Sequence, residues 1–258
     1  MQQSSSGNNR DFLRQLVTFG AIIGAFLVNV ASNIFPLNGV SIGEISNTVF
    51  RDVLIIPANY AFAIWGVIYL GLFAFAVYQV LPAQRHQSDL RQIDYLLIIA
   101  SVAQSVWVYL FLGRLFAVSV VAMLLILLPL IVAYLRLGIG INPVSRNQKW
   151  CVHFPISIYL GWISVATIVN LACALYFQNW DGWGISAEVW TAIMMLIAAA
   201  VAVAIVIQRR DIVYPGVTVW ALVAIASKNG DNPLLRNLAL LLAIVVVLGM
   251  FVNRWRSQ

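Results

Sequence analysis

Residues 159–170 read Tyr-Leu-Gly-Trp-Ile-Ser-Val-Ala-Thr-Ile-Val-Asn, a stretch that is apolar enough for a lipid bilayer yet carries rings, hydroxyls and an amide. On a helix, positions i, i+3, i+7 and i+11 share one face, and here they hold Tyr159, Trp162, Ala166 and Asn170. A stripe of aromatic and amide groups has little reason to face lipid tails. We therefore expect this face to contact other helices or a ligand.

The composition of the whole chain predicts an integral membrane protein. The chain has 258 residues, of which 62% are hydrophobic and 9% are charged, and its mean hydropathy is +0.91. A soluble domain carries about 25% charged residues, so these few charges cannot cover a globule of this size. The net charge of +6 does not indicate nucleic-acid binding, because the basic residues stand singly between apolar runs.

Eight apolar stretches are long enough, or nearly so, to cross about 30 Å of hydrocarbon as helices. They cover residues 16–35, 59–81, 93–112, 116–135, 151–177, 188–207, 212–227 and 234–252. The seventh stretch is short. The polar residues 1–15 are expected to form a disordered N-terminal tail. The predicted fold class is therefore an all-α polytopic membrane protein.

The basic residues orient these spans. With both termini in the cytoplasm, 11 of the 15 Lys and Arg residues lie inside, and the outer ones are Arg51, Arg114, Lys228 and Arg236. This split follows the positive-inside rule and supports an even number of spans. Lys228 precedes a turn and is expected at the outer edge, which argues against a retinal Schiff base in the hydrocarbon. The composition fits a bacterial inner membrane, or alternatively a thylakoid.

Two further spans carry stripes of the same kind. At i, i+3 and i+7 the second span has Phe62, Trp65 and Tyr69, and the third has Gln104, Trp107 and Phe111. Core packing and interfacial belts explain many aromatic residues, but Trp107 and Trp162 lie well inside their spans. The amides of Gln104 and Asn170 need partners in hydrocarbon, either across helices or in a ligand. From the residues alone, core packing and a ligand pocket both remain open.

The outer segment 36–58 is longer than a simple connection requires. It is either a lid over the outer end of the bundle or a re-entrant or surface-lying loop without a ligand. The middle of the predicted spans has no charged residue, which lowers the expectation of ion-driven transport. The sequence shows no metal-ligand cluster, phosphate loop or catalytic triad, so we predict no catalytic and no metal residues and favour a protein that is not an enzyme.

The stripes resemble motifs of the TspO/MBR family, the tryptophan-rich sensory proteins related to the translocator protein (peripheral benzodiazepine receptor). The stretch from Tyr159 to Asn170 resembles the signature of the family's fifth helix. The third span resembles the family pattern Asn-x-x-Trp followed by Phe and Gly, with Gln104 in the place of Asn. The second span is similar in its proline, Pro57, and in the aromatic residues that lead to its Trp and Tyr.

This resemblance covers residues 16–177, and it has departures. Pro155 lies seven residues before Trp162, whereas the family's proline lies four before, and the Pro-rich end of the family's first loop is reduced to Pro57. Residues 178–258 have no counterpart in the five-helix family, and in length the chain resembles longer tryptophan-rich sensory proteins. The implied domains are thus a five-helix bundle over 16–177 and a three-helix C-terminal extension.

The resemblance implies a pocket under the first loop that takes tetrapyrroles, such as protoporphyrin IX or haem, as ligands and has no obligatory cofactor. Carried over by position, the ligand-binding residues would be Trp65, Gln104, Trp107, Tyr159, Trp162, Ala166 and Asn170. Arg51 is our own candidate for pairing with a propionate. The expected function is a membrane receptor or carrier for flat hydrophobic molecules, with a sensory or regulatory role.

Three alternatives remain: a transporter of a hydrophobic small molecule, an enzyme that degrades porphyrin under light, and a scaffold without a ligand. The expected partners are the lipid bilayer and a hydrophobic small molecule, without nucleic acid. The sequence leaves open whether the chain is a monomer or a homodimer.

Overall fold

The computed structural model describes residues 2–85 and 87–255, and the regular structure of these residues is entirely helical. The long helices are α1 (Gln2–Ile34), α3 (Ile64–Val80), α4 (Ser88–Leu112), α5 (Phe116–Arg136), α7 (Phe154–Phe177), α8 (Ala187–Gln208), α9 (Val213–Lys228) and α10 (Pro233–Trp255). Within the described residues, seven helical segments are long and apolar enough to cross a membrane, and α9 is a shorter apolar helix. The predicted fold class, an all-α polytopic membrane protein, is confirmed.

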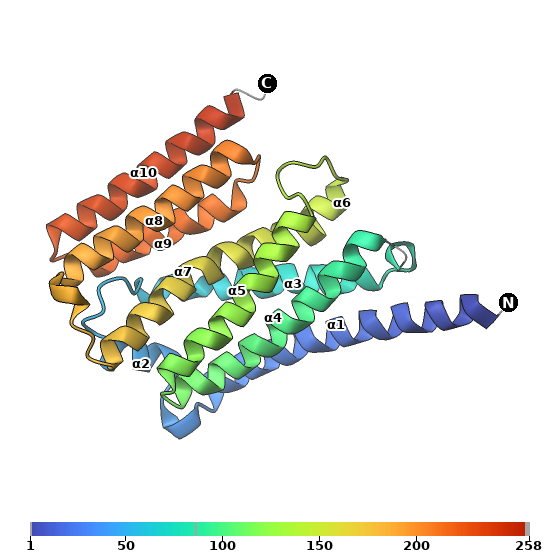
Figure 1. Cartoon of the computed structure of the whole chain (residues 1–258), viewed down its shortest axis with the longest axis horizontal. Helices are drawn as coiled ribbons and strands as arrows, with labels where there is room; N and C mark the ends of the chain where they lie inside the picture. Colours follow the sequence, from blue (N-terminus) through green and yellow to red (C-terminus); the bar gives the residue numbers. More distant parts are fainter. Residues whose placement is uncertain (1, 86, 256–258) are drawn as a thin grey trace.

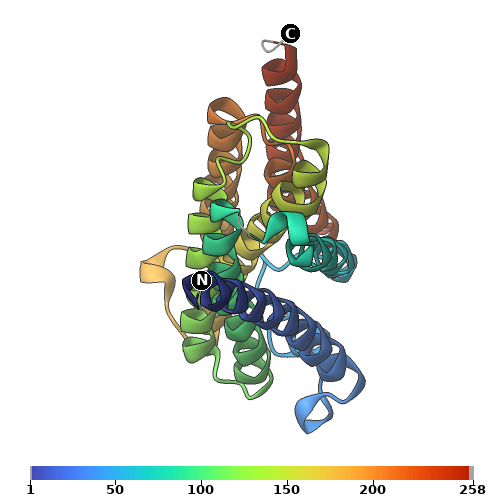
Figure 2. The ribbon, with the colours of Figure 1, turned by 90° about the vertical axis from the view of Figure 1, so that its right-hand side faces the viewer.

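The long helices form two bundles. In the first, α1 contacts α3 and α4, α5 contacts α4 and α7, and α3 contacts α7, which closes a ring of five helices. In the second, α8, α9 and α10 contact one another, and α9 packs on α7. Figure 1 shows this order from α10 at one edge of the molecule to α1 at the other, and Figure 2 shows it from the side. Helix α7 therefore lies between the two bundles.

Small residues bring α7 close to its neighbours on both sides. A Cβ atom on Gly71 of α3 would lie 3.3 Å from the side chain of Pro155 in α7. A Cβ atom on Gly161 of α7 would lie 3.0 Å from the Cβ of Val217 and 3.3 Å from the carbonyl oxygen of Tyr214 in α9. In a bilayer, helix association depends on this kind of close packing, because lipid tails are as apolar as the helices.

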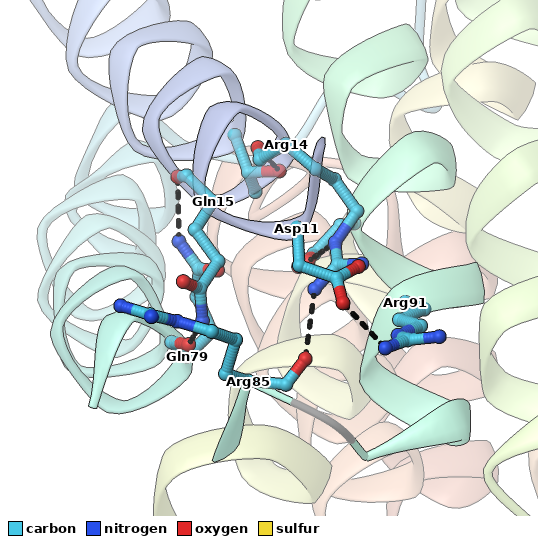
Figure 3. Close-up of polar contacts among 8 residues, drawn as sticks. Asp11, Arg14, Gln15, Gln79, Arg85 and Arg91 are labelled. Atoms are coloured by element: carbon cyan, nitrogen blue, oxygen red, sulfur yellow. Dashed lines mark hydrogen bonds and ion pairs between the residues drawn. The ribbon is translucent and has the colours of Figure 1, made fainter. Parts of the chain in front are cut away.

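The N-terminal segment differs from the disordered tail expected over residues 1–15. Helix α1 begins at Gln2, and the side chains of Asp11, Arg14 and Gln15 are buried. The guanidinium of Arg14 donates to Asp94 of α4 at 2.8 Å and to Asp11 at 2.5 Å. Figure 3 shows Arg14 next to Asp11. The polar side chains at this end of α1 are therefore paired across helices.

A second contact fixes the same end of α1. Gln15 and Gln79 each donate a side-chain N–H to the backbone carbonyl oxygen of the other, which joins α1 to α3 (Figure 3). Arg91 of α4 also pairs with Asp11. Buried amides and ion pairs of this kind are held only when their partners are in place, since an unpaired member is costly. They set the register of α1 against the ring at the predicted cytoplasmic end.

The outer segment between α1 and α3 covers the opposite end of the five-helix ring. It contains a short helix, α2 (Ile42–Thr48), which begins with a capping box in which Ser41 and Glu44 each bond the backbone N–H of the other. These bonds to Ser41 lower the pKa of the Glu44 carboxyl. Phe50 is fully buried, with its ring centroid 4.7 Å from that of Phe116. The segment is thus packed onto the bundle in the manner of a lid.

Candidate functional site

A cavity of about 60 Å³ lies under α2, between α3, α4, α5 and α7. Six of the seven residues predicted to bind a ligand line it: Trp65, Gln104, Trp107, Trp162, Ala166 and Asn170. These residues come from three helices that are separated in the sequence. The stripes expected to face inward therefore meet at one cavity between the helices.

The rings at this cavity pack on one another as well as facing the open space. Trp65 stacks on Tyr69, with centroids 5.6 Å apart and an interplanar angle of 29°. Trp162 is buried, and its indole meets Phe62 edge to face at 5.8 Å. Trp65 and Trp107 are only half-buried, so both indoles keep surface that is not covered by protein. Offset and edge-to-face contacts of this kind are the favoured geometries of aromatic pairs.

Tyr159, the seventh predicted residue, lies outside the cavity lining. It is fully buried, and its hydroxyl donates to the Oε1 of Gln104. The Nε2 of Gln104 donates to the hydroxyl of Tyr69 at 2.6 Å, and Tyr69 donates to the carbonyl oxygen of Ala25 at 3.3 Å. This chain of bonds joins α7, α4, α3 and α1. Tyr159 therefore orients the amide of Gln104 from behind.

Asn170 is the centre of a second set of bonds. Its Oδ1 accepts from the indole Nε1 of Trp107 at 2.9 Å, and its Nδ2 donates to the Oγ of Ser119 at 3.1 Å. Ser119 in turn donates to the carbonyl oxygen of Phe116 at 2.7 Å. The bonds link α4, α5 and α7. Sequence reasoning missed Ser119, although a hydroxyl among the apolar residues of its span was a readable signal.

These bonds change what the amides contribute to the site. Both Gln104 and Asn170 have protein partners, which satisfies the need for partners that the sequence raised. The surface left to a ligand is mainly hydrocarbon and aromatic. Because the amide of Asn170 holds the indole of Trp107, the polar groups fix the orientation of a ring that lines the cavity.

The sequence also missed two walls of the cavity. Met123 and Ile126 of α5 line it, but α5 is so uniformly apolar that no stripe marks its inward face. Ile42 and Ser46 of α2 line it from above. The capping-box pattern that starts at Ser41 could have revealed this short helix.

A family model described as a TSPO-like protein matches residues 15–252. The chain belongs to the TSPO-like family. The match extends into α10, beyond the resemblance seen in the sequence, which ended at residue 177. No curated protein and no solved structure matches the chain.

In this TSPO-like protein the second bundle also holds the outer segment. The backbone N–H of Ala58 donates to the carbonyl oxygen of Ala224 at 3.0 Å. The indole of Trp220 donates to the carbonyl oxygen of Ala61 at 3.0 Å. Asn229 donates to the carbonyl oxygen of Leu54 at 2.9 Å. Helix α9 thus anchors the C-terminal part of the segment, whereas α2 lies beyond these anchors.

Proposed function

We propose that this TSPO-like protein is a membrane-embedded receptor or carrier that binds a flat hydrophobic molecule of the tetrapyrrole class. One observation carries the proposal: indoles from three helices, Trp65, Trp107 and Trp162, line the same cavity. A porphyrin is a large flat π-system, and indole rings offer it stacking and edge contacts. The small side chain of Ala166 leaves room beside them. A sensory or regulatory role in a bacterial inner membrane fits such a site.

The proposal requires the cavity to enlarge on binding. Sites for small molecules typically have volumes of about 300–1,000 Å³, far above the 60 Å³ of the closed cavity. Such enlargement needs the half-buried rings of Phe62 and Trp65 to change rotamer and α2 to lift from the bundle, and the anchors to α9 begin only at Leu54, beyond α2. A ligand that opens the cavity shifts the population towards a more open state of the protein.

A titration tests the proposal. The protein in lipid nanodiscs is titrated with protoporphyrin IX, and binding is followed by the Soret band of the porphyrin. We expect saturable binding that Ala166→Phe weakens at least tenfold, or about 1.4 kcal/mol, because the added ring fills the cavity. Ala200→Phe is the matched control, since Ala200 is exposed on α8.

A second variant, Trp107→Ala, removes one indole and should also weaken binding. Non-saturable binding that is the same in wild type, Ala166→Phe and Trp107→Ala would contradict the proposal. Thermal unfolding of each variant shows whether a loss of binding reflects a loss of fold.

A further inference from the structure

Basic side chains gather where the two bundles meet, at the end of the molecule opposite the outer segment. Two segments form this junction: residues 136–157, which run from the end of α5 into α7, and residues 206–214, which include the turn between α8 and α9. Their lysine and arginine residues are Arg136, Arg146, Lys149, Arg209 and Arg210, and their one acidic residue is Asp211. The charge of the junction is therefore strongly positive.

Hydrogen bonds hold the two segments together. The backbone N–H of Arg210 donates to the carbonyl oxygen of Gly140 at 2.7 Å, and the guanidinium of Arg209 donates to the carbonyl oxygen of Ile139 at 3.0 Å. Figures 1 and 2 show the loop that precedes α6 (Arg146–Gln148) beside the turn between α8 and α9. Cations from both bundles thus belong to one surface.

The acidic residue of the junction points inward. Asp211 is buried, and its carboxylate accepts from the hydroxyl groups of Tyr134 at 2.8 Å and Ser157 at 2.5 Å. It also accepts from the backbone N–H of Val213 at 2.9 Å. The carboxylate therefore joins α5, α7 and the start of α9 from within, and it does not lie on the surface that the cations form.

The exposed cations of the junction lack acidic partners. Arg146, Lys149 and Arg210 are exposed, and none of them forms an ion pair with another residue in the ranges 2–85 and 87–255. Lys149 lies about two helical turns before Ser157, which bonds Asp211, the neighbour of Arg210. Like charges that approach one another repel, and an anion beside them relieves that repulsion. The surface is therefore complementary to an anionic partner.

Apolar side chains lie among these cations. Ile141, Trp150, Ile207 and Ile212 are all exposed in the same two segments. Tryptophan is enriched at membrane–water interfaces, and surfaces that combine basic with apolar side chains are typical of contact with lipid headgroups. A soluble anion would leave these apolar side chains in water. A bilayer surface with acidic headgroups matches both the charge and the apolar groups.

We infer that the junction of the two bundles binds an anionic phospholipid, whose phosphate pairs with Lys149 and Arg210 and whose acyl chains lie along the exposed isoleucines. Lys149 precedes α7 of the first bundle, and Arg210 precedes α9 of the second. A headgroup that contacts both cations adds a bridge between the bundles to the one that Asp211 makes. This inference does not depend on the cavity or on its ligand.

The test uses the full chain in detergent, titrated with phosphatidylglycerol or with zwitterionic phosphatidylcholine of the same acyl chains. Native mass spectrometry counts the bound lipids. We expect the wild type to bind its first phosphatidylglycerol about tenfold more tightly than phosphatidylcholine, or more, because each cation near an anionic surface contributes about fivefold. The double variant Lys149→Gln with Arg210→Gln should bind both lipids with similar affinity.

Two further variants complete the design. Arg114→Gln with Arg236→Gln is the matched control, because it removes the same charge from exposed positions at the opposite end of the molecule and should keep the preference. Lys149→Arg with Arg210→Lys keeps the charge of the junction and should also keep the preference. Thermal unfolding in phosphatidylcholine nanodiscs shows whether each variant remains folded.

Equal affinity of the wild type for the two lipids, or an unchanged preference in the variant Lys149→Gln with Arg210→Gln, would overturn the inference. An equal loss of preference in the matched control would show an effect of net charge alone and would overturn it as well. Glycerol 3-phosphate is the soluble probe. Displacement of phosphatidylglycerol by this probe would assign the surface to a soluble phosphate and would overturn the assignment to a lipid.

Discussion

At the scale of single residues, the site depends on amides that bridge helices. Asn170 accepts from Trp107 and donates to Ser119, so one side chain satisfies polar groups from two other helices. The net contribution of such a hydrogen bond to folding stability is modest, but leaving one buried partner without a hydrogen bond lowers stability by more than that. The interior of this bundle is therefore specified by a few polar contacts within an apolar background.

This asymmetry leads to a prediction for Asn170. Asn170→Leu leaves the indole N–H of Trp107 without its acceptor and should lower the free energy of unfolding by about 1–3 kcal/mol. The double variant Asn170→Leu with Trp107→Phe removes both partners of the hydrogen bond. Its free energy of unfolding should therefore fall by less than the sum of the decreases in the two single variants. Thermal or denaturant unfolding of the single and double variants measures the coupling energy between Asn170 and Trp107. Strictly additive changes in the free energy of unfolding would contradict the prediction. Asn33→Leu, at an exposed position on α1, is the control.

At the scale of elements, α7 serves both bundles. One of its faces supplies Trp162, Ala166 and Asn170 to the cavity, whereas Gly161 lies against α9. The helix is preceded by a π-helical turn, Lys149–His153, just before Pro155. Proline has no N–H for the preceding turn, and a wider turn accommodates that loss. Pro155 and Gly161 lie at the close contacts of α7 with α3 and α9.

The contact at Gly161 predicts the effect of a larger residue. Gly161→Val would push against Val217 and the carbonyl of Tyr214, and overpacking of this kind costs about 1–3 kcal/mol. Gly216→Val is the matched control, because a Cβ atom on Gly216 of α9 would meet nothing within 4 Å. We expect Gly161→Val alone to lower the melting temperature in detergent. An equal effect of the two variants would argue against close packing of α7 and α9.

At the scale of the whole molecule, the two bundles are joined at both ends. At one end Asp211, between α8 and α9, accepts from Tyr134 of α5 at 2.8 Å and from Ser157 of α7 at 2.5 Å. At the other end, Trp220 of α9 and Asn229, which directly follows α9, hold the outer segment. The C-terminal bundle is therefore part of the structure that closes the cavity.

Removing the hydrogen bonds of Trp220 and Asn229 should make the outer segment between α1 and α3 more mobile. In the double variant Trp220→Phe and Asn229→Ala, two hydrogen bonds of about 1 kcal/mol each are removed. Residues 54–61 should then open about 5- to 30-fold more often, which amide hydrogen exchange measures. Trp183→Phe with Asn237→Ala is the control, since both residues are exposed. Unchanged exchange in the anchor variant would show that packing alone holds the segment.

The sequence by itself determined the class of protein, the apolar helices and the inward faces of three of them, because hydropathy and helical periodicity are local properties of the chain. It therefore placed Trp65, Trp107 and Trp162 on the faces that meet at the cavity. Only the tertiary structure decided that Tyr159 lies behind Gln104, that Ser119 bonds Asn170, that the N-terminal segment is paired, and that the closed cavity is small. These features depend on how surfaces distant in the sequence fit and which polar groups meet across helices, and composition does not encode that pairing.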